Sequence, residues 1–371
     1  MFEYKNIDVI KSANQFEIEG DIKSVERFGS GHINDTYCVT TNRPGGKRYL
    51  LQRVNSNIFQ NVAGLMDNTN LVIDHLKRKL ISLGQEPDVE KKTLTLIPTR
   101  TGELFFQDQE SDCWRMFILI EDTKSYDIVG TPAQAFSGGQ AFGDFQRSLS
   151  DLDATRLVEI LPNFHNIDFR MSNLAAAIAE DAAGRAVEVQ DVLTYIFDRK
   201  DRMRTVLKMG NEGKLPLRIT HNDTKFNNVL LDMNDNVQCV IDLDTVMPGY
   251  VAYDFGDAIR TIINSAAEDE EDLSKVILNI PLYEAYSRGY LSEAKDFLTA
   301  DERDSLLHGV FLLPYMQAVR FLTDYLNGDT YYKIQYPTHN LVRTNAQLKL
   351  VHELESNEQM LANILNASMS I

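Results

Sequence analysis

The spacing of hydrophobic and polar residues changes part-way along the chain. Up to about residue 121, short apolar runs alternate with turns rich in glycine, proline and asparagine, such as Asn42-Arg-Pro-Gly-Gly46. This pattern predicts a small antiparallel sheet with a helix from about residue 65 to residue 80. The predicted strands span residues 25–28, 37–40, 48–54, 94–98 and 113–120.

Beyond residue 121, apolar residues recur with the spacing of amphipathic helices. Short strands around Val229 and Val240 interrupt this helical region. The sequence therefore predicts an α+β fold with a β-rich N-terminal lobe at residues 1–121 and a larger, mostly helical C-terminal lobe at residues 122–371. The predicted helices span residues 134–149, 174–183, 187–208, 273–290, 303–326 and 343–365.

Composition narrows the class of protein. The 371 residues suggest about two domains, and a net charge of −17 argues against a phosphate backbone, and thus nucleic acid, as partner. The cysteines, Cys38, Cys113 and Cys239, are far apart and form no metal-binding or disulfide pattern, which indicates a reducing compartment. The sequence shows no signal-peptide pattern and no apolar run long enough for a membrane span, so we expect a cytoplasmic protein.

The segment from residue 219 to residue 244 carries the most specific chemistry. Asp223 precedes Asn228 by five residues, and Asp242 ends a later apolar run. Phosphoryl transfer needs a carboxylate that accepts the proton of a hydroxyl group, together with an amide oxygen and a second carboxylate that hold Mg²⁺. Polar hairpin turns are the alternative, but the joint spacing favours a catalytic loop. Lys225 is either a cation that stabilises the transferring phosphoryl group or a solvated lysine.

Neighbouring residues support this loop. We expect His221 to organise the backbone rather than transfer protons. Asp244 follows Asp242 by two residues, so on a strand both carboxylates would point the same way, towards a second ion or a substrate hydroxyl. A polar turn is the alternative there. Residues 253–257 are predicted to form a tight polar turn, in which Asp254 braces the loop.

The N-terminal lobe contains a candidate phosphate-binding turn. A glycine turn between strands lets backbone N–H groups approach phosphates, although many ordinary hairpins also contain two glycines. Kinase-type lobes carry a lysine on the third strand, but here Gln52 occupies the matching position. Arg53 lies beside it on the opposite face, as a phosphate ligand or as a surface charge. The candidate turn residues are Gly29, Ser30, Gly31, His32 and Asn34.

Arg320 and Tyr331 are candidates near the C-terminal end. Arg320 interrupts an apolar helical face, and a buried arginine needs a partner, which is either an acidic residue or the substrate. Tyr331 follows a Gly-Asp turn and either stacks on a ring of the substrate or packs against the protein.

The motif His221-Asn-Asp223 with Asn228 and Ile241-Asp242 resembles the aminoglycoside phosphotransferase and choline kinase superfamily. Longer strings, at residues 50–55, 221–230, 239–249 and 320–331, are together most similar to the N-acetylhexosamine 1-kinases of that superfamily. The resemblance implies a protein-kinase-like bilobal fold. It also implies phosphorylation, dependent on ATP and Mg²⁺, of the anomeric hydroxyl of N-acetylglucosamine or N-acetylgalactosamine.

The resemblance also assigns roles by position. Asp223 would be the base, Asn228 and Asp242 the metal ligands, and Arg320 and Tyr331 part of the sugar site, with Asp242 also facing the sugar. The adenine would lie along residues 117–120, which include Ile118 and Ile120. We expect the sugar and ATP as small-molecule partners, with no nucleic acid, membrane or obligatory protein partner. The alternatives are a same-fold kinase acting on choline, homoserine or an aminoglycoside, and a non-catalytic relative.

Overall fold

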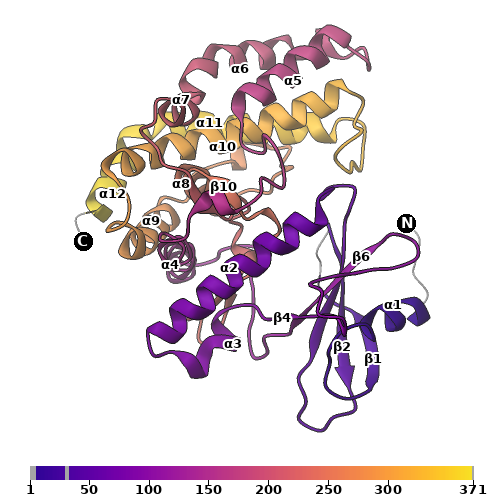
Figure 1. Ribbon diagram of the computed structural model, residues 1–371. Helices are drawn as coiled ribbons and strands as arrows, with labels where there is room; N and C mark the ends of the chain where they lie inside the picture. Colours follow the sequence, from indigo (N-terminus) through magenta and orange to yellow (C-terminus); the bar gives the residue numbers. More distant parts are fainter. Residues whose placement is uncertain (1–5, 30–32, 370–371) are drawn as a thin grey trace. The chain divides into compact units, whose positions relative to one another are not determined.

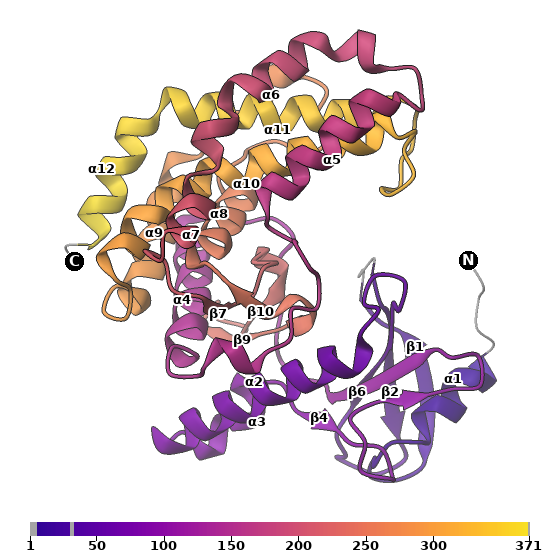
Figure 2. The ribbon, with the colours of Figure 1, turned by 45° about the horizontal axis from the view of Figure 1, so that its top comes forward.

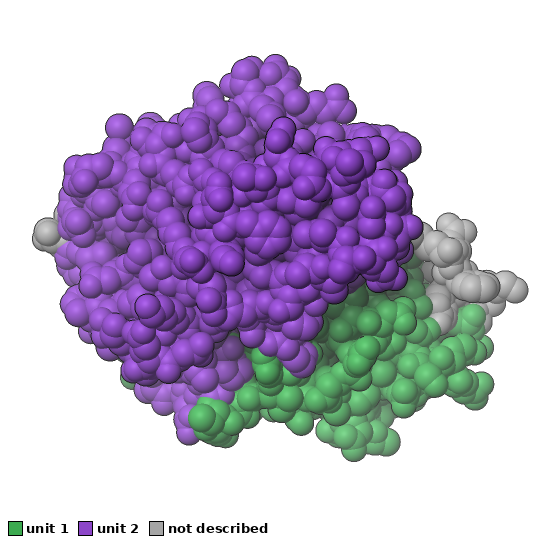
Figure 3. All heavy atoms as spheres, turned by 90° about the horizontal axis from the view of Figure 1, so that it is seen from above, with its two compact units in different colours: residues 1–124, 155–161, 230–247 green, residues 125–154, 162–229, 248–371 purple. Residues whose placement is uncertain are grey.

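The computed structural model describes residues 6–29 and 33–369, and the chain divides into two compact units (Figure 3). Unit 1 comprises residues 1–124, 155–161 and 230–247. Unit 2 comprises residues 125–154, 162–229 and 248–371. Unit 1 thus extends slightly beyond residue 121 and includes two later segments of the chain.

Unit 1 is built on an antiparallel sheet in the strand order β1-β2-β3-β6-β4, with β5 also paired to β6 (Figure 1). The predicted antiparallel sheet is therefore confirmed. The sheet is preceded by α1 (Asn6–Ala13) and consists of β1 (Ile22–Arg27), β2 (Asp35–Thr41), β3 (Tyr49–Val54), β4 (Leu96–Ile97), β5 (Phe106–Gln107) and β6 (Cys113–Ile118).

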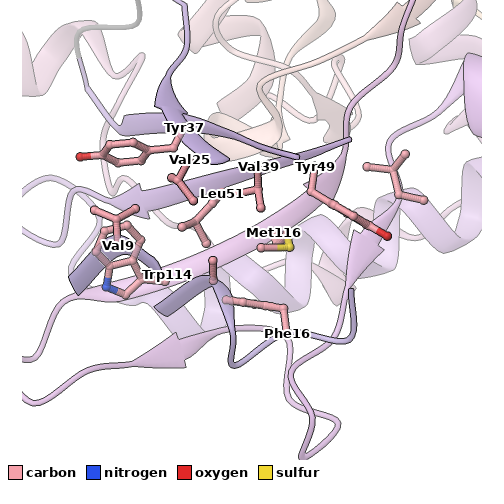
Figure 4. Packing of buried hydrophobic residues seen from close by; sticks show 11 residues of the cluster. Val9, Phe16, Val25, Tyr37, Val39, Tyr49, Leu51, Trp114 and Met116 are labelled. Carbon is pink, nitrogen blue, oxygen red and sulfur yellow. The ribbon is translucent and has the colours of Figure 1, made fainter. Parts of the chain in front are cut away.

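Alternation along the strands gives the sheet one apolar face. Val39, Leu51 and Met116 lie on this face and pack against Val9 of α1 and against Phe16 (Figure 4). Their immediate neighbours on β3 and β6 project from the opposite face, because successive side chains alternate. The second face is therefore available to polar residues.

Helix α2 (Val62–Ser82) contacts the two later segments of unit 1, residues 155–161 and 230–247. Asn61 caps its first turn by accepting a hydrogen bond from Gly64 N. Asn68 Nδ2 donates to Val158 O at 2.8 Å and to Val246 O at 3.1 Å. A buried asparagine thus joins both inserted segments to one helix. The remaining elements of this region are α3 (Val89–Lys92), β8 (Val229–Leu231) and β9 (Val237–Val240), of which the two strands pair.

Unit 2 is mostly helical, and α10 packs against α5, α8 and α11, while α4 packs against α9 (Figure 2). A short pair of strands, β7 and β10, accompanies the helices. The elements are α4 (Pro132–Ser148), α5 (Ile167–Glu180), α6 (Gln190–Met203), α7 (Thr205–Asn211), β7 (Arg218–Thr220), β10 (Met247–Gly249), α8 (Val251–Ile262), α9 (Ile280–Ala294), α10 (Ala300–Leu326), α11 (His339–Ser356) and α12 (Glu358–Met369).

The structure of this unit differs from four of the sequence predictions. The turn predicted at residues 253–257 is part of α8, because its glycine serves helix packing rather than a turn. A Cβ on Gly256 would lie 2.3 Å from Gly309 O of α10. The helix predicted at residues 273–290 starts only at Ile280, where Asn279 accepts a hydrogen bond from Leu282 N as its cap. The helices predicted at 187–208 and 343–365 are each divided in two.

Candidate active site

The predicted catalytic loop follows β7 in unit 2 and brings its three candidate side chains together. Asn228 Nδ2 donates to Asp223 O at 2.9 Å and to Asp223 Oδ2 at 3.2 Å. Lys225 Nζ lies 2.9 Å from Asp223 Oδ1. Because the amide N–H groups of Asn228 face Asp223, its Oδ1 is oriented away as an acceptor. One loop therefore presents a carboxylate, a cation and an amide oxygen.

Asp254 of α8 braces this loop through hydrogen bonds to its backbone. Its Oδ1 accepts from Asn222 N at 2.7 Å, and its Oδ2 accepts from His221 N at 2.8 Å and from Gln146 Nε2 at 2.7 Å. Its carbonyl oxygen accepts from Thr224 Oγ1 at 2.7 Å. The predicted bracing role of Asp254 is confirmed, although the residue lies on a helix. The carboxylate thereby fixes the backbone directly before the candidate base.

His221 also has the organising role that the sequence predicts. Its ring is fully buried between Phe142 and Phe145, which it meets edge-on with ring centroids 5.5 and 5.7 Å away. Its Nδ1 accepts a hydrogen bond from Asp223 N at 3.3 Å. The ring is therefore a structural support of the loop.

His165 holds the loop from another side and was missed in the sequence. Its Nε2–H donates to Asn222 O at 3.4 Å, since a carbonyl oxygen can only accept. Burial, together with the neighbouring Arg320 and Arg170, lowers the pKa of His165 to about 4. The carboxylate of Asp257 and the hydrogen bond to the Asn222 carbonyl raise the pKa but offset only part of this effect. The imidazole is therefore neutral at neutral pH, in the tautomer with its proton on Nε2.

Lys225 remains charged despite its partial enclosure. Its side chain is 47% exposed. Desolvation lowers the pKa of this amine, but the Asp223 carboxylate and then Asp257 outweigh it, so the pKa lies above its ordinary value. A permanent positive charge thus lies beside the carboxylate of Asp223.

Arg320 on α10 and Arg170 on α5 form a positively charged cluster in the same unit. The guanidinium of Arg320 lies 5.6 Å from the ring centroid of Phe164 and 5.7 Å from that of Tyr332, and it donates to Gln317 Oε1 at 3.1 Å. Arg170 donates to Phe164 O at 2.8 Å, while its buried Nε has no hydrogen-bond partner.

These guanidinium groups lack acidic partners. Within residues 6–29 and 33–369, no carboxylate lies within ion-pair distance of Arg170 or Arg320. Burial, and then Arg320, lower the pKa of Arg170 to about 10. The cluster therefore has uncompensated charge and hydrogen-bonding capacity.

Tyr331 lies next to this cluster on a turn fixed by Asp324. The buried Asp324 carboxylate accepts from Tyr331 N at 2.8 Å and from Tyr332 N at 2.9 Å. Gly328 and Asp329 give the turn its left-handed conformations, with φ of +85° and +62°. The Tyr331 ring is 66% exposed and meets Tyr332 edge-on, so it offers an open aromatic surface.

In unit 1, polar side chains form a row across the second face of the sheet. Thr36, Gln52 and Arg115 lie opposite one another on β2, β3 and β6. Gln52 Nε2 donates to Thr36 Oγ1 at 3.1 Å, and Arg115 Nε donates to Gln52 Oε1 at 3.0 Å. Arg115 also forms an ion pair with Asp244, which accepts a hydrogen bond from Asn34 Nδ2 at 2.7 Å.

The strand geometry predicted for Asp242 and Asp244 is wrong. Residues 243–245 form a 3₁₀ turn, and Asp242 has a left-handed conformation with φ of +61°. Asp244 is buried and bound to Arg115 and Asn34, whereas Asp242 is exposed. The left-handed conformation of Asp242, like that of Asn222 at +63°, carries strain that often marks functional sites.

The remaining candidates of unit 1 have diverse surroundings. Gly29 has φ of +74°, which suits glycine, and the Oδ1 of Asn34 accepts a hydrogen bond from Asn55 N at 3.0 Å. Arg53 lies on the other face from Gln52 and pairs with Asp35 and with Asp112. Ser30, Gly31 and His32 lie outside the described residues.

The candidate adenine strand is already partly occupied by backbone hydrogen bonds. Ile118 packs in the core, and its N–H donates to Thr95 O at 2.9 Å. The N–H of the next residue, Leu119, donates to Arg48 O at 2.9 Å. Ile120 is buried. An adenine ring along this strand would need its hydrogen bonds from other backbone groups.

The described part of the chain contains no cluster of three or more histidine, cysteine or acidic residues that could hold a metal ion. A divalent ion would instead need an amide or phosphate oxygen among its ligands. Of the predicted metal ligands, Asn228 belongs to unit 2 and Asp242 to unit 1. No helix within residues 6–29 and 33–369 has the length and hydropathy of a membrane span.

Comparison with known proteins identifies the family. The model of the phosphotransferase enzyme family (APH) matches residues 24–300, which is well over half of the chain. The chain belongs to this phosphotransferase family. Solved structures have the same protein-kinase-like fold, with an antiparallel sheet region followed by a helical region.

Three of these structures illustrate the likeness in fold. A microcompartment-associated aminopropanol kinase is 15% identical, with a TM-score of 0.62, and the match covers 95% of this chain and 98% of that one. Amicoumacin kinase in complex with AMP-PNP, Ca²⁺ and Ami is 12% identical, with a TM-score of 0.59 and 93% coverage of both chains. Choline kinase from Cryptosporidium parvum Iowa II is 13% identical, with a TM-score of 0.55 and coverage of 98% and 99%.

Sequence reasoning missed Arg115, Arg170 and His165. Arg115 had a usable signal, because it is a lone charge inside the apolar strand Cys113–Ile118. His165 and Arg170 lack such a signal. Their roles depend on contacts with residues 222 and 320, which are distant in the sequence.

Proposed function

We propose that this phosphotransferase transfers the γ-phosphoryl group of ATP to the anomeric hydroxyl of an N-acetylhexosamine, GlcNAc or GalNAc, in a Mg²⁺-dependent reaction. The observation that carries the proposal is the loop in which Asp223 contacts both Asn228 and Lys225. The match to the family supports the reaction type, and the sequence resemblance to N-acetylhexosamine 1-kinases supports the acceptor.

Asp223 is the general base of the proposed reaction. It would orient the acceptor hydroxyl and take its proton as the oxygen attacks the γ-phosphorus, with ADP as the leaving group. An anomeric hydroxyl is more acidic than an ordinary alcohol, so a carboxylate can manage this transfer mainly through its position. Lys225 would stabilise the negative charge of the transferring group.

The residues present fit a hard divalent cation. In unit 2 the Oδ1 of Asn228 is left as an acceptor, and in unit 1 Asp242 has an exposed side chain; each is an oxygen ligand of the kind that Mg²⁺ prefers. When bound, Mg²⁺ would neutralise charge on the nucleotide phosphates. The relative solved with AMP-PNP and Ca²⁺ is consistent with a nucleotide and a divalent ion.

Unit 1 would bind the nucleotide, as the sequence predicts for residues 1–121. Gly29 and Asn34 would shape the phosphate-binding turn, and the adenine would lie along residues 117–120. Unit 2 would bind the sugar through Arg320 and Tyr331.

The arginine cluster favours a sugar over a cationic acceptor. Relatives include kinases named for choline and aminopropanol, which makes a small amino alcohol the main competing acceptor. Arg170 and Arg320 have no acidic partner among the described residues, so they would repel an ammonium group. The hydroxyl and acetamide oxygens of a sugar would instead accept hydrogen bonds from them, and Tyr331 could cover the ring.

An ADP-release assay with a panel of acceptors tests the proposal. The panel contains N-acetylglucosamine, N-acetylgalactosamine, choline, homoserine and an aminoglycoside, each with and without Mg²⁺. We expect turnover with an N-acetylhexosamine, and ³¹P NMR should show phosphate on the anomeric oxygen. Turnover with choline but with no N-acetylhexosamine would replace the proposed acceptor.

Asp223→Asn is the decisive variant within this assay. We expect kcat to fall by about 1,000-fold or more while nucleotide binding persists, because only the proton acceptor is lost. Asp201→Asn, which removes an equal charge from an exposed position of α6, should retain full activity. Full activity of Asp223→Asn would exclude this residue as the base.

A further inference from the structure

The strand position that carries the phosphate-binding lysine in kinase-type lobes holds a neutral residue in this chain. Gln52 occupies that position of β3 and cannot supply a positive charge. The nearby cations are engaged elsewhere. Lys47 Nζ lies 2.7 Å from Glu90 Oε1, and Arg53 lies on the opposite face of β3 in an ion pair with Asp35.

Arg115 brings a cation to the neighbouring strand at the same level. Gln52 and Arg115 are direct partners in the β3–β6 register, so their side chains lie on the same face of the sheet. The Arg115 Nε donates to Gln52 Oε1 at 3.0 Å. The positive charge of this chain therefore lies on β6, one strand away from the lysine position on β3. Gln52, which occupies the lysine position, accepts a hydrogen bond from this charged group.

Arg115 is unusual because it is almost completely buried. Its side chain is 2% exposed and that of Asp244 is 4% exposed. Outside their mutual ion pair, Arg115 Nη1 and Asp244 Oδ1 have no hydrogen-bond partner. Replacing a buried ion pair by apolar residues is often neutral or stabilising, so stability alone gives little reason for this pair. A guanidinium has five N–H donors; Nε donates to Gln52 and Nη1 faces Asp244, so these two partners do not use all five.

The Arg115–Asp244 pair is also hydrogen-bonded to Asn34. Asn34 Nδ2 donates to Asp244 Oδ2 at 2.7 Å, and Asn34 Oδ1 accepts from Asn55 N at 3.0 Å. The residue two positions before Asp244 is the proposed metal ligand Asp242. Through Asp244, the cation is therefore linked to Asn34, a residue that the proposed function assigns to the phosphate-binding turn.

We propose that Arg115 of β6 is the cation that binds the β- and γ-phosphates of the nucleotide in place of a β3 lysine. Asp244 and Gln52 are its positioning residues. Asp244 forms an ion pair with the guanidinium, and Gln52 fixes the plane of the guanidinium through the hydrogen bond from Nε. A planar guanidinium offers paired N–H donors that match phosphate oxygens. This inference rests on the proposed ATP-dependent function and names the residue that performs one part of it.

Affinities for a series of nucleotides test the inference without any acceptor. ATP, ADP, AMP and adenosine are titrated by calorimetry against the wild type and against Arg115→Gln. We expect Arg115→Gln to lose about 10- to 100-fold in affinity for ATP and ADP, with adenosine almost unchanged. Arg43→Gln removes an equal charge from an exposed pair with Glu19 and should change none of the affinities.

A charge-swap variant separates phosphate binding from a structural role. Gln52→Lys combined with Arg115→Gln returns the cation to β3, and Arg115→Lys keeps it on β6. Both variants should regain much of the preference for ATP over adenosine, because each restores a cation in the row. Their circular dichroism spectra and melting temperatures establish that they fold.

The outcomes distinguish this inference from the proposed function. If the wild type binds ATP no better than adenosine, the proposed nucleotide function fails and the inference fails with it. If the wild type prefers ATP and folded Arg115→Gln keeps the same preference, the inference alone is overturned. An equal loss for all four ligands would assign Arg115 a structural role and would also overturn it.

Discussion

His165 offers a direct test of how unit 2 supports its catalytic loop. The substitution His165→Gln retains an N–H donor that can reach Asn222 O but removes the titratable group. In the wild type, burial and two nearby arginines lower the pKa of His165 to about 4, from an ordinary value of 6.5. The variant should therefore fold as the wild type does at neutral pH and differ from it only in acid.

The sign and size of the effect follow from this pKa. The folded state disfavours protonated His165, so the stabilisation is complete above pH 6.5 and is lost as the pH falls towards 4. At pH 5 the unfolded histidine has already bound its proton, whereas the folded one has not. Between the two pKa values, each pH unit changes the free energy of unfolding by about 1.4 kcal/mol. Between pH 7 and pH 5, the free energy of unfolding of the wild type should therefore fall by about 2 kcal/mol more than that of His165→Gln.

Urea unfolding at pH 7 and pH 5, followed by far-ultraviolet circular dichroism, measures this difference. A ¹H NMR titration of the His165 ring should show its midpoint near pH 4. His352→Gln, which removes an exposed histidine of α11, controls for the loss of a histidine as such. A midpoint near 6.5, or equal acid sensitivity of wild type and His165→Gln, would refute the reasoning.

Other substitutions test the remaining contacts of unit 2. Asp254→Asn should destabilise the protein by about 3 kcal/mol, because the amide cannot accept hydrogen bonds from all three N–H donors. The kcat should fall in parallel, and an unchanged melting temperature would contradict the bracing role. Lys225→Met should lower kcat by about 100-fold with little change in nucleotide affinity, and steady-state kinetics would show equal rates if the lysine were merely solvated. Gly256→Ala should cost about 2 kcal/mol or more in urea unfolding, since its Cβ would lie 2.3 Å from Gly309 O, and a variant of wild-type stability would show that α8 can move away.

The parts of the fold that were predictable depend on local patterns. Strand alternation and turn residues predict the sheet of unit 1, because these signals lie within a few neighbouring residues. Helix α8 was not predictable in this way. Its Gly256 and two aspartates are typical of a turn, and only the carbonyl of Gly309, far along the chain, shows that the glycine is needed for packing.

The same distinction applies to the candidate site. Asp223, Lys225 and Asn228 lie within six residues of one another, so their spacing alone predicted the loop that the structure shows. Arg115 and Asp244 form an ion pair although they lie 129 positions apart in the sequence. No local pattern reports such a pairing, and only the lone charge in an apolar strand hinted at it.

Each irregular segment of the candidate site is held by a carboxylate that does not itself act in the proposed reaction. Asp254 holds the loop before Asp223, Asp324 holds the turn that carries Tyr331, and Asp244, within the 3₁₀ turn after Asp242, binds Arg115 and Asn34. Each of these carboxylates is buried, and a buried charge is tolerated only when its partners are in place. Loss of a bracing carboxylate should therefore reduce stability and activity together. Loss of the partly exposed Asp223 should reduce activity alone, and this contrast separates the reacting carboxylate from those that position it.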